Sequence, residues 1–301
     1  MGAMRIPEPP PAGTLGHFLR SRRARLTPEG VGLVSYGARR VPGLRREELA
    51  QLAGVSATYY TRLEQGQSTN ASESVIDALA SALSLDDDER GHLHDLARPA
   101  RTKRRRAARP DLARPGTVRL LTAMTDVPAV VLGRRTEVLA WNRLGHLLVA
   151  GHVDVEAPGR PADRPNLARM LFLDHHTREL YPRWEEEAAR AVASLRLVAG
   201  QFRADVELAA LVGELVLKSD EFAALWSKHP VRSCVSGTKH LRHPVVGALE
   251  LEFEILHLPD AGGHRLMTYT AGPGTPSESG LRLLGTSSRV EGGVRSASAV
   301  G

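Results

Sequence analysis

The sequence predicts a multidomain protein in which an all-α domain of five helices precedes an α+β domain with an antiparallel sheet and helices. Two observations lead to this fold class. Five stretches with apolar residues at helical spacing fall before residue 98. Beyond residue 127, β-branched residues and apolar–polar alternation appear between further helical stretches, which indicates strands.

A basic, proline-containing stretch separates the two parts. Residues 98–116 hold three prolines and eight basic residues against one acid, which is typical of a linker. The proline-rich start and the Ser/Gly/Ala/Val tail predict disorder at both ends. The expected organisation is a disordered start at 1–13, an all-α domain at 14–97, a linker at 98–116, an α+β domain at 117–285 and a disordered tail at 286–301.

Charge is unevenly distributed along the 301 residues. Residues 1–115 hold 19 Lys and Arg against 13 Asp and Glu, whereas residues 116–301 hold equal numbers of both kinds. A basic module beside a neutral one suggests that only the first meets a polyanion. The single Cys234 excludes an intrachain disulfide and fits a reducing cytosol. No run of apolar residues is long enough to span a membrane, so none is expected as a partner.

The helices of the first half follow from apolar spacing and from their capping residues. Thr14, Ser56 and Ser72 are expected N-caps, and three acids open the last helix, where the helix dipole favours them. Residues 27–43 contain Gly and Pro and predict a long loop. The expected helices are residues 14–26, 44–54, 54–66, 72–85 and 86–97.

The second half mixes strands with helices. Residues 127–142 predict two short strands around a Gly-Arg-Arg turn, and residues 239–259 and 264–271 predict a hairpin of longer strands. Helical patterns occupy residues 166–173, 184–199, 205–217 and 219–228. A last short helix is expected at 276–284.

The stretch GVSATYYTRLEQG at 54–66 has helix-turn-helix spacing. Gly54 supplies a sharp turn after a short helix, and Ser56 caps the next one. Val55, Tyr60 and Leu63 share one face, so Tyr60 is predicted to be the core tyrosine. The opposite, exposed face is expected to carry Ala57, Thr58, Tyr59, Thr61 and Arg62.

The exposed face has the chemistry to enter a DNA major groove. Arg62 can donate two hydrogen bonds to guanine, and Thr58 and Thr61 can contact a base or a phosphate. Tyr59 can donate its hydroxyl to a phosphate. The alternative is a small helical bundle whose third helix is merely solvated.

REELAQLAGVSATYYTRLEQG closely resembles the Cro/phage-repressor-like helix-turn-helix of the XRE family. The resemblance implies phosphate contact by Arg46 and base reading near Ala57, Thr58 and Arg62. Ala57 departs from the pattern, because a methyl group can read only a thymine methyl. Further residues that the resemblance implies at the DNA are the cap Ser56 and the loop residues Gln67, Ser68 and Asn70. Arg39 and Arg40, in the loop at 27–43, either add phosphate contacts or are solvated.

The second half is similar to the MmyB-like transcription regulators of actinobacteria, on motifs such as VPAVVLGRRTEVLAWN, YPRWEEEAARAVASLRLVAG and HPVVGALELEFEIL. With the helix-turn-helix, the resemblance covers residues 14–285. It implies a PAS-like ligand-binding domain that senses a hydrophobic effector, of which a fatty acid is one candidate. It also implies a bacterial, cytoplasmic and nucleoid-associated regulator.

Motifs of catalysis or metal binding are missing from the second half. None of the histidines forms an HExxH or Cys/His pattern, and no nucleophile elbow or phosphate loop is present. We therefore expect no enzyme, no metal and no cofactor beyond a bound fatty acid or similar apolar ligand. Glu250, Glu252 and Glu254 alternate with apolar residues, which favours a solvated sheet face over a metal site.

Aromatic residues of the second half are either ordinary core or the lining of a ligand site. An acidic apolar ligand would also need a polar anchor, for which Arg135, His229 and Arg232 are candidates. The ligand-binding set predicted from the sequence is Trp141, Phe172, Tyr181, Trp184, Phe222, Trp226, His229, Arg232 and Phe253.

The sequence therefore predicts a sequence-specific regulator that binds a double-stranded DNA operator. Because one half-site gives weak binding, we expect a homodimer on an inverted repeat. In one alternative, the C-terminal domain serves only dimerisation or protein interaction. In others, a helical module binds RNA or a membrane surface through its basic linker, or the second domain acts alone as a hydrophobic-ligand carrier or enzyme.

Overall fold

The computed structural model describes residues 14–33, 43–68, 71–98, 111–259 and 262–297, with side chains up to residue 286. Several sequence predictions lie outside these residues. They are the disorder of residues 1–13, most of the linker, and the roles of Arg39, Arg40 and Asn70.

The chain divides into two compact units, and neither is one continuous stretch. Unit 1 comprises the described residues up to 98, together with Val192–Ala210 and Ala223–Ser233. Unit 2 comprises the described residues from 111 to Ala191, Leu211–Phe222, and the chain from Cys234 onward. Each unit is described by itself below.

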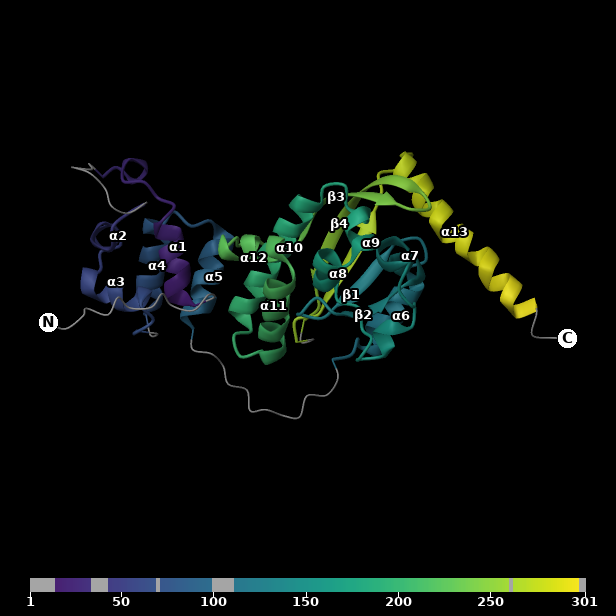
Figure 1. Cartoon of the computed structure of the whole chain (residues 1–301), viewed down its shortest axis with the longest axis horizontal. Coiled ribbons are helices and arrows are strands. Elements are labelled where there is room, and N and C mark those ends of the chain that lie inside the picture. Colours follow the sequence, from purple (N-terminus) through teal and green to yellow (C-terminus); the bar gives the residue numbers. More distant parts are fainter. Residues whose placement is uncertain (1–13, 34–42, 69–70, 99–110, 260–261, 298–301) are drawn as a thin grey trace. The chain divides into compact units, whose positions relative to one another are not determined.

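In the described part of the chain before residue 98, five helices form the first part of unit 1, which confirms the predicted all-α part (Figure 1). Thr14, Ser56, Ser72 and Asp86 each accept a hydrogen bond from a backbone N–H in the first turn of the helix that follows. The helices are α1 (Leu15–Arg23), α2 (Arg46–Leu52), α3 (Ala57–Glu64), α4 (Glu73–Ala82) and α5 (Asp87–Ala97), with a 3-10 turn at Glu29–Val31.

The core of unit 1 forms where the apolar stripes of these helices meet. Leu19, Leu49, Tyr60 and Leu79 are each fully buried there. Helices α1 and α3 approach closely because residue 16 is glycine. A Cβ at Gly16 would lie only 2.1 Å from the carbonyl oxygen of Glu64.

Two segments from the second half of the sequence complete unit 1. They carry the end of helix α10 (Trp184–Gln201), the start of α11 (Val206–Lys218) and most of α12 (Asp220–Ser227). Val231 belongs to the same core as the five helices, and Leu197 packs against it. The Arg203 guanidinium donates to the carbonyl of Leu96 at 2.8 Å, so residues distant in sequence are joined inside one unit.

Unit 2 is built on a five-stranded antiparallel sheet of order β2-β1-β5-β4-β3. The strands are β1 (Ala129–Leu132), β2 (Val138–Trp141), β3 (Ser236–His243), β4 (Gly247–His257) and β5 (Arg265–Thr270). The pair around the Gly-Arg-Arg turn is confirmed. The stretch 239–259 is itself a hairpin, because the chain turns between His243 and Gly247, where Gly247 has φ +76°.

Helices cover both faces of this sheet to different extents. One face packs Val130, Leu251 and Tyr269 against α7 (Arg143–Ala150), α9 (His175–Leu180) and α13 (Pro276–Ala297). The other face packs β1, β2 and β5 against α6 (Pro115–Ala123). Where α6 does not reach, Glu250, Glu252 and Glu254 on β4 are exposed, which confirms the solvated face predicted for them.

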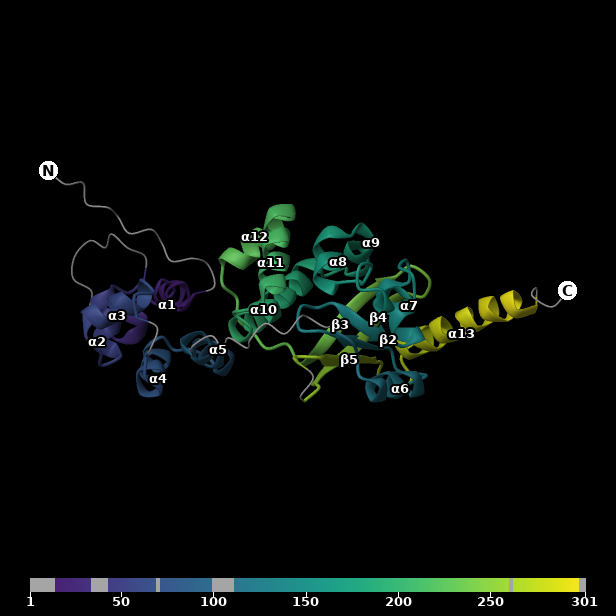
Figure 2. The same cartoon turned by 90° about the horizontal axis from the view of Figure 1, so that it is seen from below.

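Three helices of unit 2 lie where none was predicted, and one is longer than predicted. These three are α6, α7 and α9, and the helical pattern at 166–173 is confirmed as α8 (Leu167–Leu173). Helix α13 continues to Ala297, past the end predicted for the last helix at residue 284. Both views show this helix running on beyond the sheet (Figures 1 and 2).

Asn142 joins three elements of unit 2 at one point. Its Oδ1 accepts the backbone N–H of Gly145 as the N-cap of α7, and also that of Ala129 at the start of β1. Its Nδ2 donates to the carbonyl oxygens of Met124 and Val127.

Among the described residues, no helix is both long and apolar enough to cross a lipid bilayer.

Candidate DNA-binding helix and ligand cavities

The turn between α2 and α3 has the geometry that the sequence predicts. Gly54 has φ +66°, which glycine adopts without strain, and the N–H of Val55 donates to the carbonyl of Ala50 at 3.0 Å. Ser56 then caps α3 by accepting the N–H of Tyr59 at 3.1 Å. The two helices are therefore joined by a short turn that backbone hydrogen bonds and the Ser56 cap close.

The two tyrosines of α3 face different surroundings. Tyr60 is fully buried and is the core tyrosine, as predicted, and burial raises the pKa of its hydroxyl. Tyr59 is half-buried and its ring packs against the core, so its placement on a fully exposed face is wrong. Ala57 and Thr61 are also half-buried, whereas Thr58 and Arg62 are exposed. The free surface of α3 is narrower than the sequence suggests and centres on these last two residues.

A buried carboxylate fixes α3 against α1 and α2. Glu64 accepts two hydrogen bonds from Arg23, at 2.9 and 3.0 Å, and its Oε1 pairs with Arg46 at 2.9 Å. Burial alone would raise the pKa of Glu64, but the hydrogen bonds and charge of Arg23 outweigh it and lower that pKa. Arg46 opens α2 with a partly exposed side chain, so it can pair with Glu64 and still reach a phosphate.

The loop after α3 carries Gln67 and Ser68, the two loop residues predicted to contact DNA that lie within the described residues. Gly66 has φ +71°, and the N–H of Gln67 donates to the carbonyl of Arg62, which closes the helix. Gln67 is exposed and Ser68 is half-buried. Both therefore lie just beyond the end of α3, ahead of α4.

A buried basic cluster lies within unit 1, where the sequence predicted a ligand anchor. Arg22 on α1 donates to the carbonyl of His229 at 2.8 Å and pairs with Glu89 at 2.8 Å. Arg196 on α10 donates to Nδ1 of His229 at 2.8 Å, and its guanidinium lies 3.8 Å from the ring centre of Trp226. His229 and Trp226 are thus engaged by other side chains of unit 1.

Burial keeps two histidines of this region neutral. Burial, and then the charge of Arg196, lowers the pKa of His92 and of His229 to about 3. His229 accepts from Arg196 at Nδ1, which requires the neutral ring. His92 lies against Gly200 of α10, where a Cβ would come within 2.5 Å of the imidazole.

The predicted aromatic set does not converge on one site. In unit 2, Phe172 packs edge-on against Trp184 and Phe222, with ring centres 5.6 and 5.0 Å apart. Phe253 and Tyr181 both face the ammonium of Lys239. Nε1 of Trp141 donates to the carbonyl of Val155. Trp226 and the exposed Arg232 belong to unit 1. Arg135 pairs with Glu137 at 3.1 Å.

Two cavities in unit 2 are lined by residues that the structure describes, and none of the predicted aromatic residues lines either of them. The larger, of about 660 Å³, has an apolar floor that includes Leu148, Leu180 and Leu284. Its rim carries polar groups, among them Arg242 and His152. The smaller, of about 500 Å³, lies between β5 and α13 and includes Tyr269. Sequence reasoning missed Arg242, because nothing in its neighbourhood predicts that the β3–β4 turn borders a cavity.

Two family models match the chain in the order that the sequence predicts. The model of a helix-turn-helix domain matches residues 14–93. The model of the MmyB-like transcription regulator ligand binding domain matches residues 113–284, which is more than half of the chain. No curated protein matches it. Both models describe binding domains, and the resemblance found in each half of the sequence is confirmed.

Proposed function

Because the chain belongs to the MmyB-like transcription regulators, we propose that α3 reads a DNA operator and that unit 2 senses a hydrophobic molecule of the fatty-acid class. Together, the two family matches support a ligand-responsive transcription regulator. The observation that carries the DNA-binding part is the hydrogen-bonded α2–α3 turn, which leaves Thr58 and Arg62 exposed beside a half-buried Tyr59.

The proposed contacts differ in what they contribute. Arg62 reads guanine through two hydrogen bonds and Thr58 contacts the adjacent base, so these two residues carry sequence preference. Arg46, Gln67 and Ser68 bind phosphates and set the position of α3. The proposal also includes four residues that lie on α3 or at its N-cap, namely Ser56, Ala57, Tyr59 and Thr61.

The DNA-binding proposal is tested by selecting preferred duplexes from a random library with the full chain. Arg62→Ala should cost about 1–3 kcal/mol on the selected site and relax preference at one base position. Arg90→Ala, on α5, removes the same charge at an ion-paired position and should weaken all duplexes alike. Binding that ignores sequence and survives Arg62→Ala would refute the proposal in favour of a non-specific nucleic-acid or membrane-surface module.

For the effector we propose the cavity of about 660 Å³ in unit 2. Its volume is in the range of small-molecule sites, and its leucine floor suits an alkyl chain. Arg242 at the rim supplies a cation for an acidic head group. This assignment replaces the anchors predicted from the sequence, since His229 and Arg135 are engaged elsewhere and Arg232 belongs to unit 1.

Native mass spectrometry of the purified chain, followed by extraction with organic solvent, tests the effector directly. A discrete added mass that extracts as a lipid-like acid supports it. Saturating fatty acid should also change operator affinity, because an effector acts only through different affinities for two states. If neither an added mass nor a change in operator affinity is found, the second domain serves dimerisation or protein interaction instead.

We further propose a homodimer on an inverted repeat. One recognition helix contacts a short half-site, and two half-sites about 34–36 Å apart would bring the affinity into the range of specific regulators. Light scattering of the free chain and footprinting of the selected operator test this. A monomer that protects a single half-site would overturn it.

A further inference from the structure

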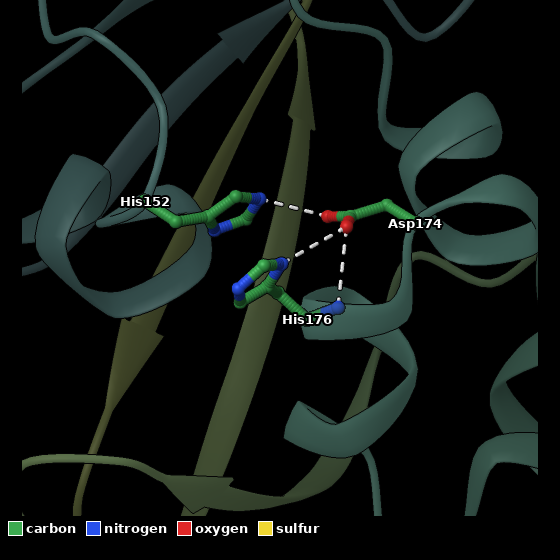
Figure 3. A group of neighbouring side chains, drawn as sticks. All are labelled: His152, Asp174 and His176. Atoms are coloured by element: carbon green, nitrogen blue, oxygen red, sulfur yellow. Dashed lines mark hydrogen bonds and ion pairs between the residues drawn. The ribbon is translucent and has the colours of Figure 1, made fainter.

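Two imidazoles and one carboxylate come together in unit 2 (Figure 3). His152 follows the end of α7, Asp174 lies between α8 and α9, and His176 is the second residue of α9. Nε2 of His152 lies 2.7 Å from Asp174 Oδ2, and Nδ1 of His176 lies 3.4 Å from Asp174 Oδ1. One nitrogen or oxygen from each residue lies within 4.8 Å of the other two.

We propose that His152, Asp174 and His176 bind a divalent transition-metal ion of the zinc, nickel or cobalt class. In a tetrahedral site with bonds of about 2.1 Å, ligand atoms lie about 3.4 Å apart. The two N–O distances, of 2.7 and 3.4 Å, and the 4.8 Å within which all three ligand atoms lie allow side-chain rotation to bring these atoms onto one ion. Two nitrogen ligands favour these metals over Mg²⁺ or Ca²⁺, which prefer oxygen.

The carboxylate is already held in place by its own helix. Asp174 is the N-cap of α9, and its Oδ1 accepts the backbone N–H of His176 at 3.1 Å. The hydroxyl of Thr177 donates to Oδ2 at 2.7 Å. Such hydrogen bonds orient ligands in metal sites and limit the cost of ordering them on binding.

Helix capping alone accounts for Asp174 and Thr177 but leaves the two imidazoles unexplained. The rings of His152 and His176 stack nearly parallel, at 14° and 4.8 Å between centres.

The site is open to an ion and to further ligands. The side chains of His152 and Asp174 are 30% and 26% exposed, and that of His176 is 68% exposed. Both imidazoles also line the cavity of about 660 Å³. Water or an acidic group in the cavity can fill the remaining coordination positions. The metal site itself does not depend on the identity of the effector.

The spacing in the sequence did not indicate this site, because His152 lies 22 residues from Asp174 and the pair His175-His176 suggested no convergence. The structure separates those two neighbours. His175 is 80% exposed and its Nε2 faces Glu179 at 3.1 Å. His175 is therefore the matched control for His176.

The test uses the full chain without an affinity tag, stripped of metal by a chelator. Titration with Co²⁺, followed by visible absorption, should give saturable uptake of one ion per chain, and Zn²⁺ should displace it. His152→Ala and His176→Ala should each weaken Co²⁺ binding by about tenfold or more. His175→Ala should bind as the unmodified chain does.

Circular dichroism confirms that each variant is folded, and the Gln variants of His152 and His176 serve if an Ala variant is not. Absence of saturable uptake overturns the proposal. So does uptake that survives both substitutions, because the ion would then be bound by other histidines. An equal loss in His175→Ala also overturns it, because it would indicate non-specific binding to exposed imidazoles.

Discussion

Substituting Gly16 tests whether close packing of α1 on α3 positions the recognition helix. A Cβ at residue 16 would lie 2.1 Å from the carbonyl oxygen of Glu64 and 2.7 Å from its carbonyl carbon. Non-bonded carbons prefer separations of about 3.5 Å or more, so the helices must move apart by about 1 Å. Overpacking of this kind costs about 1–3 kcal/mol. Gly16→Ala should therefore destabilise unit 1 and weaken operator binding.

Gly91 provides the matched control, because it lies in α5 and a Cβ there would meet no atom within 4 Å. Gly91→Ala should stabilise the protein by up to about 1 kcal/mol through helix propensity alone. Hydrogen exchange of the α3 amides reports the free energy of opening locally, and duplex binding reports the effect on function. If Gly16→Ala protects these amides as well as Gly91→Ala does, the reasoning about close approach is refuted.

The remaining predictions concern buried charge and the composition of unit 1. Glu64→Gln leaves Arg23 buried without its counter-charge and should cost about 3–5 kcal/mol in urea unfolding, whereas the exposed Glu47→Gln should cost far less. Because the pKa values of His92 and His229 fall from 6.5 to about 3 on folding, the unfolded chain takes up protons first. The free energy of unfolding that the neutral rings contribute should be fully present above pH 6.5. It should fall as the pH decreases toward 3, by up to about 1.4 kcal/mol per pH unit for each histidine. A free energy of unfolding that does not change over this pH range would contradict this. A fragment of residues 14–98 should unfold in less urea than unit 1 does in the full chain, since it lacks His229, whose carbonyl accepts from Arg22, and Arg203, which donates to the carbonyl of Leu96.

Most of the fold was predictable because local signals agreed with each other. N-caps at Thr14, Ser56 and Ser72 each precede an apolar stripe, and the structure begins a helix after each one. The missed helices have weaker signals. Helix α6 adjoins a stretch dominated by Pro and Arg, and α9 has only six residues, for which its cap Asp174 and core contacts matter more than propensity.

The DNA-binding helix was largely readable from the sequence, but its free surface was not. Helical periodicity separates Tyr60 from Tyr59, yet it cannot tell a fully exposed tyrosine from one whose ring leans on the core. The ligand set was harder to predict, because an aromatic residue in a core and one in a cavity share the same pattern. Metal ligands that lie 22 residues apart leave no local pattern at all, so only the packing of α7 and α9 brings them together.

The compact units and the family boundaries divide the chain differently. Residues 192–210 and 223–233 lie inside the range that matches the ligand-binding domain, yet they belong to the unit of the DNA-binding helices. Trp184 and Arg196 lie on one continuous helix, α10, about three turns apart. Trp184 packs against Phe172 in unit 2, and Arg196 holds His229, which in turn accepts from Arg22 on α1. Helix α10 therefore contributes residues to both units, and the range that matches the ligand-binding domain is not confined to one of them.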